Sequence, residues 1–200
     1  EREWKMMTPL SIKPPKRAYH SAWIIGGSDG FKMIIHGGQS DEGKGPNSAV
    51  ADTWRLDLST NVWTKYSSDP EAPSVSHAFV GSISNSSAVL FGGKTESNKL
   101  FGRVMSFDTT GGWVAVLPAG RRPDRRTGHV VSYDSDAGWM VVSHGMNWRG
   151  HFLDDTWTLD INTGAWTCVA GTTGGCPARK SGEKFPAANA FSAFVSTGSQ

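Results

Sequence analysis

Short apolar runs that end in glycine recur along the chain at nearly equal steps. They span residues 33–38, 88–93 and 140–145, so their last glycines, at 38, 93 and 145, lie 55 and then 52 residues apart. Each run is too short for a typical helix, and its lack of polar alternation predicts a strand that is covered on both faces. The pattern therefore predicts an all-β fold built from a repeated unit.

Other markers keep the same order in each unit. A histidine precedes the apolar run, a Trp-x-Leu-Asp segment or its variant follows the run, and a further tryptophan comes soon after. The histidines are His20, His77 and His129, the segments are 54–57, 105–108 and 157–160, and the later tryptophans are Trp63, Trp113 and Trp166. Asn and Gly between the last two markers tolerate the positive φ of tight hairpin turns. We therefore expect four short strands in each unit.

This order of markers resembles the kelch repeat, which forms one four-stranded blade of a β-propeller from about 50 residues. Residues 17–63 carry the full pattern, beginning at Arg17. Residues 126–166 differ in His144, which replaces the first glycine, and residues 73–113 have Ser74 and Met105 in place of the arginine and the tryptophan. The resemblance implies an all-β, kelch-type β-propeller segment with four-stranded antiparallel blades.

The markers divide the chain into three full blades and two partial ones. The expected bounds are 1–13 (partial), 14–66, 70–117, 122–169 and 177–200 (partial). Propellers close with about four to eight blades, so we expect an incomplete ring in this chain, with the remaining blades supplied by a longer chain or another subunit. The alternative is a four-bladed ring closed by a composite blade from both ends. At His144, the added Cβ either splays the blade or occupies a backbone conformation that accepts a side chain.

Composition and charge exclude several classes of protein. The 200 residues carry a formal net charge of +2, include 24 glycines and nine tryptophans, and contain two cysteines. This charge gives no footprint of a nucleic-acid or membrane surface. Two cysteines exclude a four-cysteine zinc site and a disulfide-dense miniprotein. We therefore predict no nucleic-acid partner, no membrane insertion, and tryptophans that fill the space between blades.

No complete catalytic or metal-binding set stands out in the sequence. Gly26–Gly30 fits a nucleophile-elbow pattern, but it joins two expected strands as a hairpin turn instead of opening a helix. His144 and His151 flank one loop, with Asp154 and Asp155 beyond it, but no cysteine completes an obvious metal set. We therefore predict no catalytic residue, metal or cofactor. The alternative is part of a propeller enzyme, galactose-oxidase-like or metal-dependent, whose catalytic residues lie partly outside this chain.

The loops after the glycines differ most between units, and loops on a rigid scaffold are where function is usually carried. In kelch proteins that bind peptides, residues past the glycine pair and around the blade-entry arginine line a shallow basin. By that resemblance the candidate partner-binding residues are Tyr19, Gln39, Ser40, Lys94, Thr127 and Asn147. The prediction is a non-enzymatic scaffold that uses these loops to bind a protein or peptide partner.

A basic stretch between two blades adds three more candidates. Arg121, Arg122 and Arg125 lie in the segment 121–126, which contains one aspartate and no aromatic residue. Guanidinium groups bind carboxylates and phosphates in a bidentate manner, so this stretch is a candidate site for an acidic peptide or a phosphate. The other interpretation is a solvated loop, because charge runs usually face water.

The two cysteines leave the cellular compartment open. Cys168 and Cys176 are eight residues apart with glycines between them, so the loop can fold back and join them. A disulfide favours a secretory compartment, as does the sequon at Asn85. Two reduced thiols favour the cytoplasm.

Overall fold

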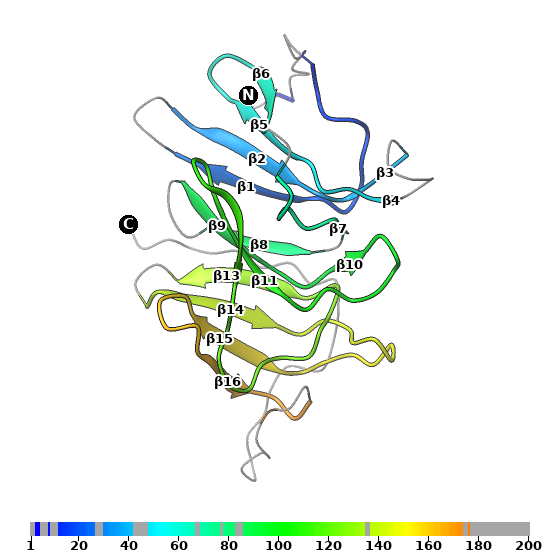
Figure 1. Cartoon of the computed structure of the whole chain (residues 1–200), viewed down its shortest axis with the longest axis vertical. Helices are drawn as coiled ribbons and strands as arrows, with labels where there is room; N and C mark the ends of the chain where they lie inside the picture. The colour runs from blue at the N-terminus through cyan, green and yellow to red at the C-terminus, as the bar shows by residue number, and fades with distance from the viewer. Residues whose placement is uncertain are drawn as a thin grey trace.

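Three antiparallel sheets of four strands form the body of the protein (Figure 1). The computed structural model describes residues 3–4, 8, 12–26, 30–41, 48–66, 69–76, 78–82, 86–134, 137–173 and 176. Within these residues no helix has the length and apolar character needed to span a membrane. The proposed partial blade at 177–200 lies outside the described residues, and the one at 1–13 lies largely outside them.

Each sheet is a meander in which strands pair in the order they follow along the chain. Sheet one consists of β1 (Ser21–Ile25), β2 (Lys32–His36), β5 (Thr53–Asp57) and β6 (Val62–Lys65). Sheet two consists of β8 (Phe79–Ser82), β9 (Ser87–Phe91), β11 (Val104–Asp108) and β12 (Gly112–Val116). Sheet three consists of β13 (Val130–Asp134), β14 (Trp139–Ser143), β15 (Thr156–Asp160) and β16 (Trp166–Ala170). Two short ladders join β3 (Gln39–Ser40) to β4 (Ser48–Ala49) and β7 (Val75–Ser76) to β10 (Lys94–Thr95).

The sheets fan out from their first strands. The first strand of sheet two, β8, lies against both β1 and β13, and the three sheets follow one another down the molecule in Figure 1. This is the arrangement of consecutive propeller blades, so the predicted all-β architecture of four-stranded antiparallel blades is confirmed. The described strands close no ring.

The middle sheet explains why the apolar runs do not alternate. Residues 88–91 on β9 are all at most 2% exposed. Ala88 and Leu90 pack into the core shared with sheet one, whereas Val89 and Phe91 pack into the core shared with sheet three. A strand between two neighbouring blades must be apolar on both faces, because neither face meets water.

Indole rings fill much of the space between the sheets, as expected. Trp23, Trp113, Trp157 and Trp166 lie in the two cores between the sheets and are all at most 8% exposed, whereas Trp54 is buried on the face of sheet one that points away from sheet two. The Trp113 ring packs 5.1 Å from Phe107 in its own sheet, and its Nε1 donates a hydrogen bond of 3.0 Å to Thr53 in sheet one. Trp63 is only half-buried, because its cross-strand partner Leu56 places it on the face of sheet one that points away from sheet two.

Pairing at the loop end of each blade corrects the alignment of the second repeat. The residue after the glycine pair bonds to an entry segment in every unit, and the partners are Ala18–Gln39, Ser76–Lys94 and Thr127–Met146. The equivalents of Arg17 and His20 in the second unit are therefore Val75 and Ala78. The sequence alignment, which placed Ser74 and His77 at these positions, was wrong by one residue, and His77 itself lies outside the described residues.

His144 takes the left-handed backbone conformation of the glycine that it replaces. Its φ is 60°, against 66° for Gly37 and 70° for Gly92. A Cβ on Gly92 would overlap the imidazole of His129 in the next sheet, whereas the imidazole of His144 lies within 2.5 Å of the Ser143 hydroxyl. The pairing of β14 with β15 keeps a regular register. His144 therefore keeps the left-handed conformation that favours glycine, β14 and β15 stay in register, and the register of sheet three shifts only between β15 and β16, at Thr156 and Trp157.

Candidate partner-binding groove

A groove of about 620 Å³ lies where the loop ends of sheets two and three meet. We call it the loop groove. Its lining comes from three segments, namely the hairpin 94–100 after β9, the entry segment 125–127, and the loop 146–150 after β14. The lining residues are Lys94, Asn98, Lys99, Leu100, Arg125, Thr127, Met146, Asn147, Trp148 and Gly150. The shape of the groove therefore depends on how sheets two and three pack against each other.

The structure brings four of the nine sequence-predicted residues together in this groove. They are Lys94, Arg125, Thr127 and Asn147. Three candidates lie at the corresponding end of sheet one, outside the groove, and these are Tyr19, Gln39 and Ser40. Arg121 and Arg122 are exposed on the segment that connects sheets two and three, and they do not line the groove.

Two of the candidates have structural roles that limit what they can offer a partner. Thr127 is fully buried, and its backbone pairs in both directions with Met146, at 2.9 and 3.0 Å. The side-chain oxygen of Asn147 accepts hydrogen bonds from the amides of Arg149 (3.0 Å) and His151 (3.1 Å). Thr127 thus belongs to the base of the groove, and Asn147 fixes the shape of its own loop.

Two lining residues that sequence reasoning missed carry much of the groove's chemistry. Trp148 is 71% exposed, with the guanidinium carbon of Arg149 4.8 Å from its ring centroid. Lys99 is exposed near the tip of the hairpin, where its backbone bonds to Thr95. The signal that could have found Trp148 is a tryptophan in a loop that follows a glycine, away from every repeat marker.

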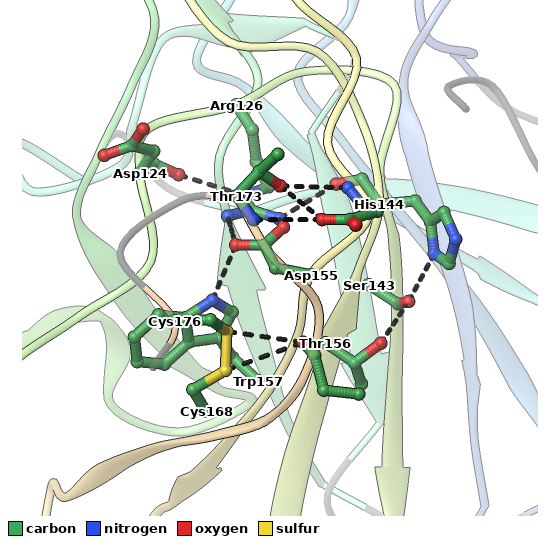
Figure 2. A network of polar contacts seen from close by, with 12 residues as sticks. Asp124, Arg126, Ser143, His144, Asp155, Thr156, Trp157, Cys168, Thr173 and Cys176 are labelled. Carbon is green, nitrogen blue, oxygen red and sulfur yellow. Dashed lines mark hydrogen bonds and ion pairs between the residues drawn. A yellow bond between two sulfur atoms is a disulfide. The ribbon is translucent and has the colours of Figure 1, made fainter. Parts of the chain in front are cut away.

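A buried ion pair fixes the entry segment of sheet three beside the groove (Figure 2). The guanidinium of Arg126 donates to both carboxylate oxygens of Asp155, at 2.6 and 2.7 Å, and to the carbonyl of His144 at 2.9 Å. The indole of Trp157 donates to the same carboxylate at 2.7 Å. Arg126 also donates to the carbonyl of Asp124 at 3.0 Å, so both backbone neighbours of Arg125 are tied to the network. Arg126 is therefore a structural arginine.

A buried imidazole joins sheets two and three near the glycine pair. His129 Nε2 bonds to the carbonyl of Phe91 at 3.0 Å across the junction. Burial, and to a lesser extent the charge of Arg126, lower the pKa of His129 to about 3. The ring is therefore neutral at physiological pH, and its protonation would cost stability at this junction.

The carboxylates near the predicted histidine pair are already engaged. Asp155 holds Arg126, and Asp154 accepts four hydrogen bonds from the amides and hydroxyls of Thr172 and Thr173. These bonds, acting against its partial burial, lower the pKa of Asp154 to about 2. Across the described ranges of the chain, no group of three His, Cys, Asp or Glu side chains is arranged to hold a metal ion.

The structure joins Cys168 and Cys176 in a disulfide, with their Cα atoms 5.5 Å apart. The bond ties β16, the outer strand of sheet three, to the loop that follows it, and it lies close to Trp157 in Figure 2. Both cysteines pack against the core between sheets two and three. Of the two states that the sequence left open, the structure therefore contains the paired one, which is the state that persists in oxidising compartments.

Comparison with known proteins assigns the family. Residues 1–196 match the model of the KLHDC2/KLHL20/DRC7 Kelch-repeats domain. The chain belongs to this kelch-repeat family. Members of the family typically bind protein partners. A curated protein named tRNA wybutosine-synthesizing protein 4, from Gibberella zeae, is 24% identical over 160 residues, which cover 76% of this kelch chain and 15% of that protein. The chain therefore spans a small part of this relative's length.

Proposed function

We propose that this kelch domain is a protein-binding scaffold whose contact site is the loop groove. The observation that carries the proposal is the convergence of polar and aromatic side chains from two sheets on one concave surface at the loop end. Loops placed by a rigid β-scaffold are the usual carriers of binding function. The fixed backbones of both loops favour recognition with little ordering cost on binding.

The side chains around the groove suit binding better than bond breaking. Lys94, Lys99 and Asn98 can form hydrogen bonds with a partner, and the exposed indole of Trp148 offers a flat apolar surface. Trp and Arg are the residue types that most often dominate interface energies. The partner that fits such a surface is a peptide segment or a protruding loop of another protein.

A selection from a random peptide display library on the immobilised protein tests this function without assuming any ligand chemistry. Binders are then measured against Trp148→Ala and against Trp139→Ala, which removes another exposed indole of sheet three outside the groove lining. We expect at least a tenfold loss of affinity for Trp148→Ala and less than a twofold change for Trp139→Ala. Failure to select any peptide that depends on Trp148 would overturn the proposal.

A further inference from the structure

We infer that the loop groove takes an acidic peptide segment of the partner, in which carboxylates pair with Lys94, Lys99 and Arg125 and an apolar side chain packs on Trp148. This inference rests on the proposed function, since it names the chemistry of the ligand in the same groove. Nothing in the family match specifies it. It comes from the charges around the groove, the way in which Arg125 is held, and the exposure of one indole.

Every charged residue in the described lining of the groove is a cation. Lys94, Lys99 and Arg125 line it, and no described acidic residue does. In the part of the chain that the structure describes, these three side chains form no ion pair, whereas Arg17 and Arg126 are each bound by an aspartate. Like charges around a concave surface sum to a positive potential that attracts anions and speeds their association. The charge that would complement this surface is negative.

The pocket between sheets one and two provides an internal contrast. It has a similar volume, about 550 Å³, but its lining combines Lys65 with Asp52 and Asp69. Asp52 is paired with Arg17, and Asp69 accepts a hydrogen bond from the backbone of Trp113. That pocket has no single sign of charge, so the cationic lining is a property of the loop groove and not of every gap between blades.

The aliphatic stem of Arg125 packs on the backbone of Gly102, while the residue as a whole is exposed. A Cβ on Gly102 would overlap its Cγ and lie 2.7 Å from its Cδ, so the aliphatic stem rests directly on the Gly102 backbone. The backbone on either side is fixed by Arg126, whose side chain bonds to the Asp124 carbonyl at 3.0 Å. Because part of the stem is already packed, the guanidinium can donate to both oxygens of a carboxylate with a smaller loss of side-chain entropy than a fully solvated arginine.

Trp148 supplies the apolar half of the recognition. It projects from a tight turn closed by a hydrogen bond of 3.1 Å from the Gly150 amide to the Asn147 carbonyl. Its ring is backed by Arg149 and is 71% exposed. A rigid tryptophan at the rim of a basic groove favours a segment that carries one apolar residue beside its acidic ones, instead of a uniformly acidic tail.

The test uses the tightest Trp148-dependent peptide from the display selection, synthesised with both ends blocked so that neither terminus contributes charge. A second version carries Asn and Gln in place of every Asp and Glu. We expect the blocked acidic peptide to bind at least tenfold more tightly than its amide version, and raising the salt concentration from 50 to 300 mM to weaken the acidic peptide alone. A third version with phosphoserine at one acidic position shows whether a phosphate can replace a carboxylate, and a phosphoserine version that binds at least tenfold more tightly than the acidic peptide would overturn the assignment of carboxylates as the ligand.

Two charge-reversed variants localise the effect. Lys99→Glu and Arg125→Glu are each expected to weaken the acidic peptide at least tenfold, while Arg121→Glu, an exposed position on the same connecting segment, changes it less than twofold. Gly102→Ala keeps every charge but displaces the Arg125 stem, so we expect a loss of about threefold or more without a change in thermal stability. Trp148-dependent peptides that bind equally well without carboxylates would overturn this inference and leave the proposed function standing. A selection without any such peptide would overturn both.

Discussion

The start of β15 in sheet three carries a buried polar network, whereas the equivalent positions in sheet two hold two buried apolar residues and an exposed arginine. The equivalent residues are Arg126, Asp155 and Trp157 in sheet three and Val75, Arg103 and Met105 in sheet two. Sheet one repeats the polar version, since Arg17 donates to both oxygens of Asp52. All three members of the network differ together in sheet two, so the network is replaced as a unit.

The difference between the two sheets shows how a blade can lack the buried ion pair without a loss of stability. Removing one member alone leaves an uncompensated charge in the core, which destabilises strongly, whereas replacing the set by packed apolar groups is often neutral. In sheet two, Met105 is 1% exposed and Val75 is 2% exposed, while the charged Arg103 faces water. Sheets two and three thus share the same backbone pairing at their loop ends, although one has buried apolar side chains there and the other a buried ion pair.

Among the substitutions that test this difference between the sheets, Asp155→Ala should lower the free energy of unfolding most. Arg126 is fully buried, so loss of its carboxylate should lower the free energy of unfolding by about 3–5 kcal/mol. The equivalent Arg103→Ala in sheet two should change it by less than about 0.5 kcal/mol, because the side chain is exposed. Urea unfolding of both variants measures the difference. Similar losses in the two variants would mean that the networks are not the distinguishing feature of the sheets.

The next largest effect concerns the covalent link that sheet three carries on its outer strand. Replacing Cys168 and Cys176 together by Ser should lower the free energy of unfolding by about 2–3 kcal/mol, because the disulfide closes a short loop in the unfolded chain. Thiol titration of the unfolded wild-type protein, which should detect no free thiol, verifies the bond first. A double variant as stable as the wild type would contradict this expectation.

A smaller effect per pH unit comes from buried imidazoles, and its size depends on the pH. Burial lowers the pKa of His36 to about 4 and that of His129 to about 3. Between the ordinary pKa of about 6.5 and these values, the unfolded chain binds more protons than the folded one, so stability falls as the pH falls. Each imidazole should contribute a loss of about 1.4 kcal/mol per pH unit well inside this window.

The variant His129→Gln isolates how much of this pH dependence of stability comes from the imidazole at the junction between sheets two and three. The equivalent residue of sheet two is Ala78, which has no titrating group. Unfolding free energies at pH 6.5, 5.5 and 4.5 should decline less steeply in the variant, by about 1.4 kcal/mol per unit in the lower half of this range. An unchanged slope would show that His129 does not stay neutral in the folded protein.

The sequence predicted the strands well because their signal is local. A short apolar run that ends in glycine, in a repeat of this period, predicts a strand covered on both faces. The run at 88–93 forms β9 as expected, with residues 88–91 at most 2% exposed. The register of the second repeat was wrong because its arginine and tryptophan are both replaced, which left the spacing from Ser74 to His77 as the guide. Only backbone pairing identifies Val75 as the equivalent residue.

The candidate site was predictable in part, for a related reason. Lys94 and Asn147 could be found because they follow the glycine pairs, which fix where the loop starts. Lys99 had no such signal, and Trp148 had only that of a loop tryptophan away from every repeat marker. Exposed loop residues carry no periodic signal, and their convergence depends on how two sheets pack. The packing of the two sheets brings these loop residues together at the groove, and the repeat pattern in the sequence carries no sign of it.

The smallest expected effect tests the one position where sheet three breaks the glycine pattern that sheet two keeps. His144→Gly removes the contact with the Ser143 hydroxyl but relieves a left-handed backbone that a side chain disfavours by roughly 1 kcal/mol. The two effects oppose each other, so the free energy of unfolding should change by less than about 1 kcal/mol. Gly92→Ala in sheet two should be more harmful, because its Cβ would overlap the His129 ring. A loss above about 2 kcal/mol for His144→Gly would instead assign the imidazole, whose Nε2 atom is buried, a major structural role in sheet three.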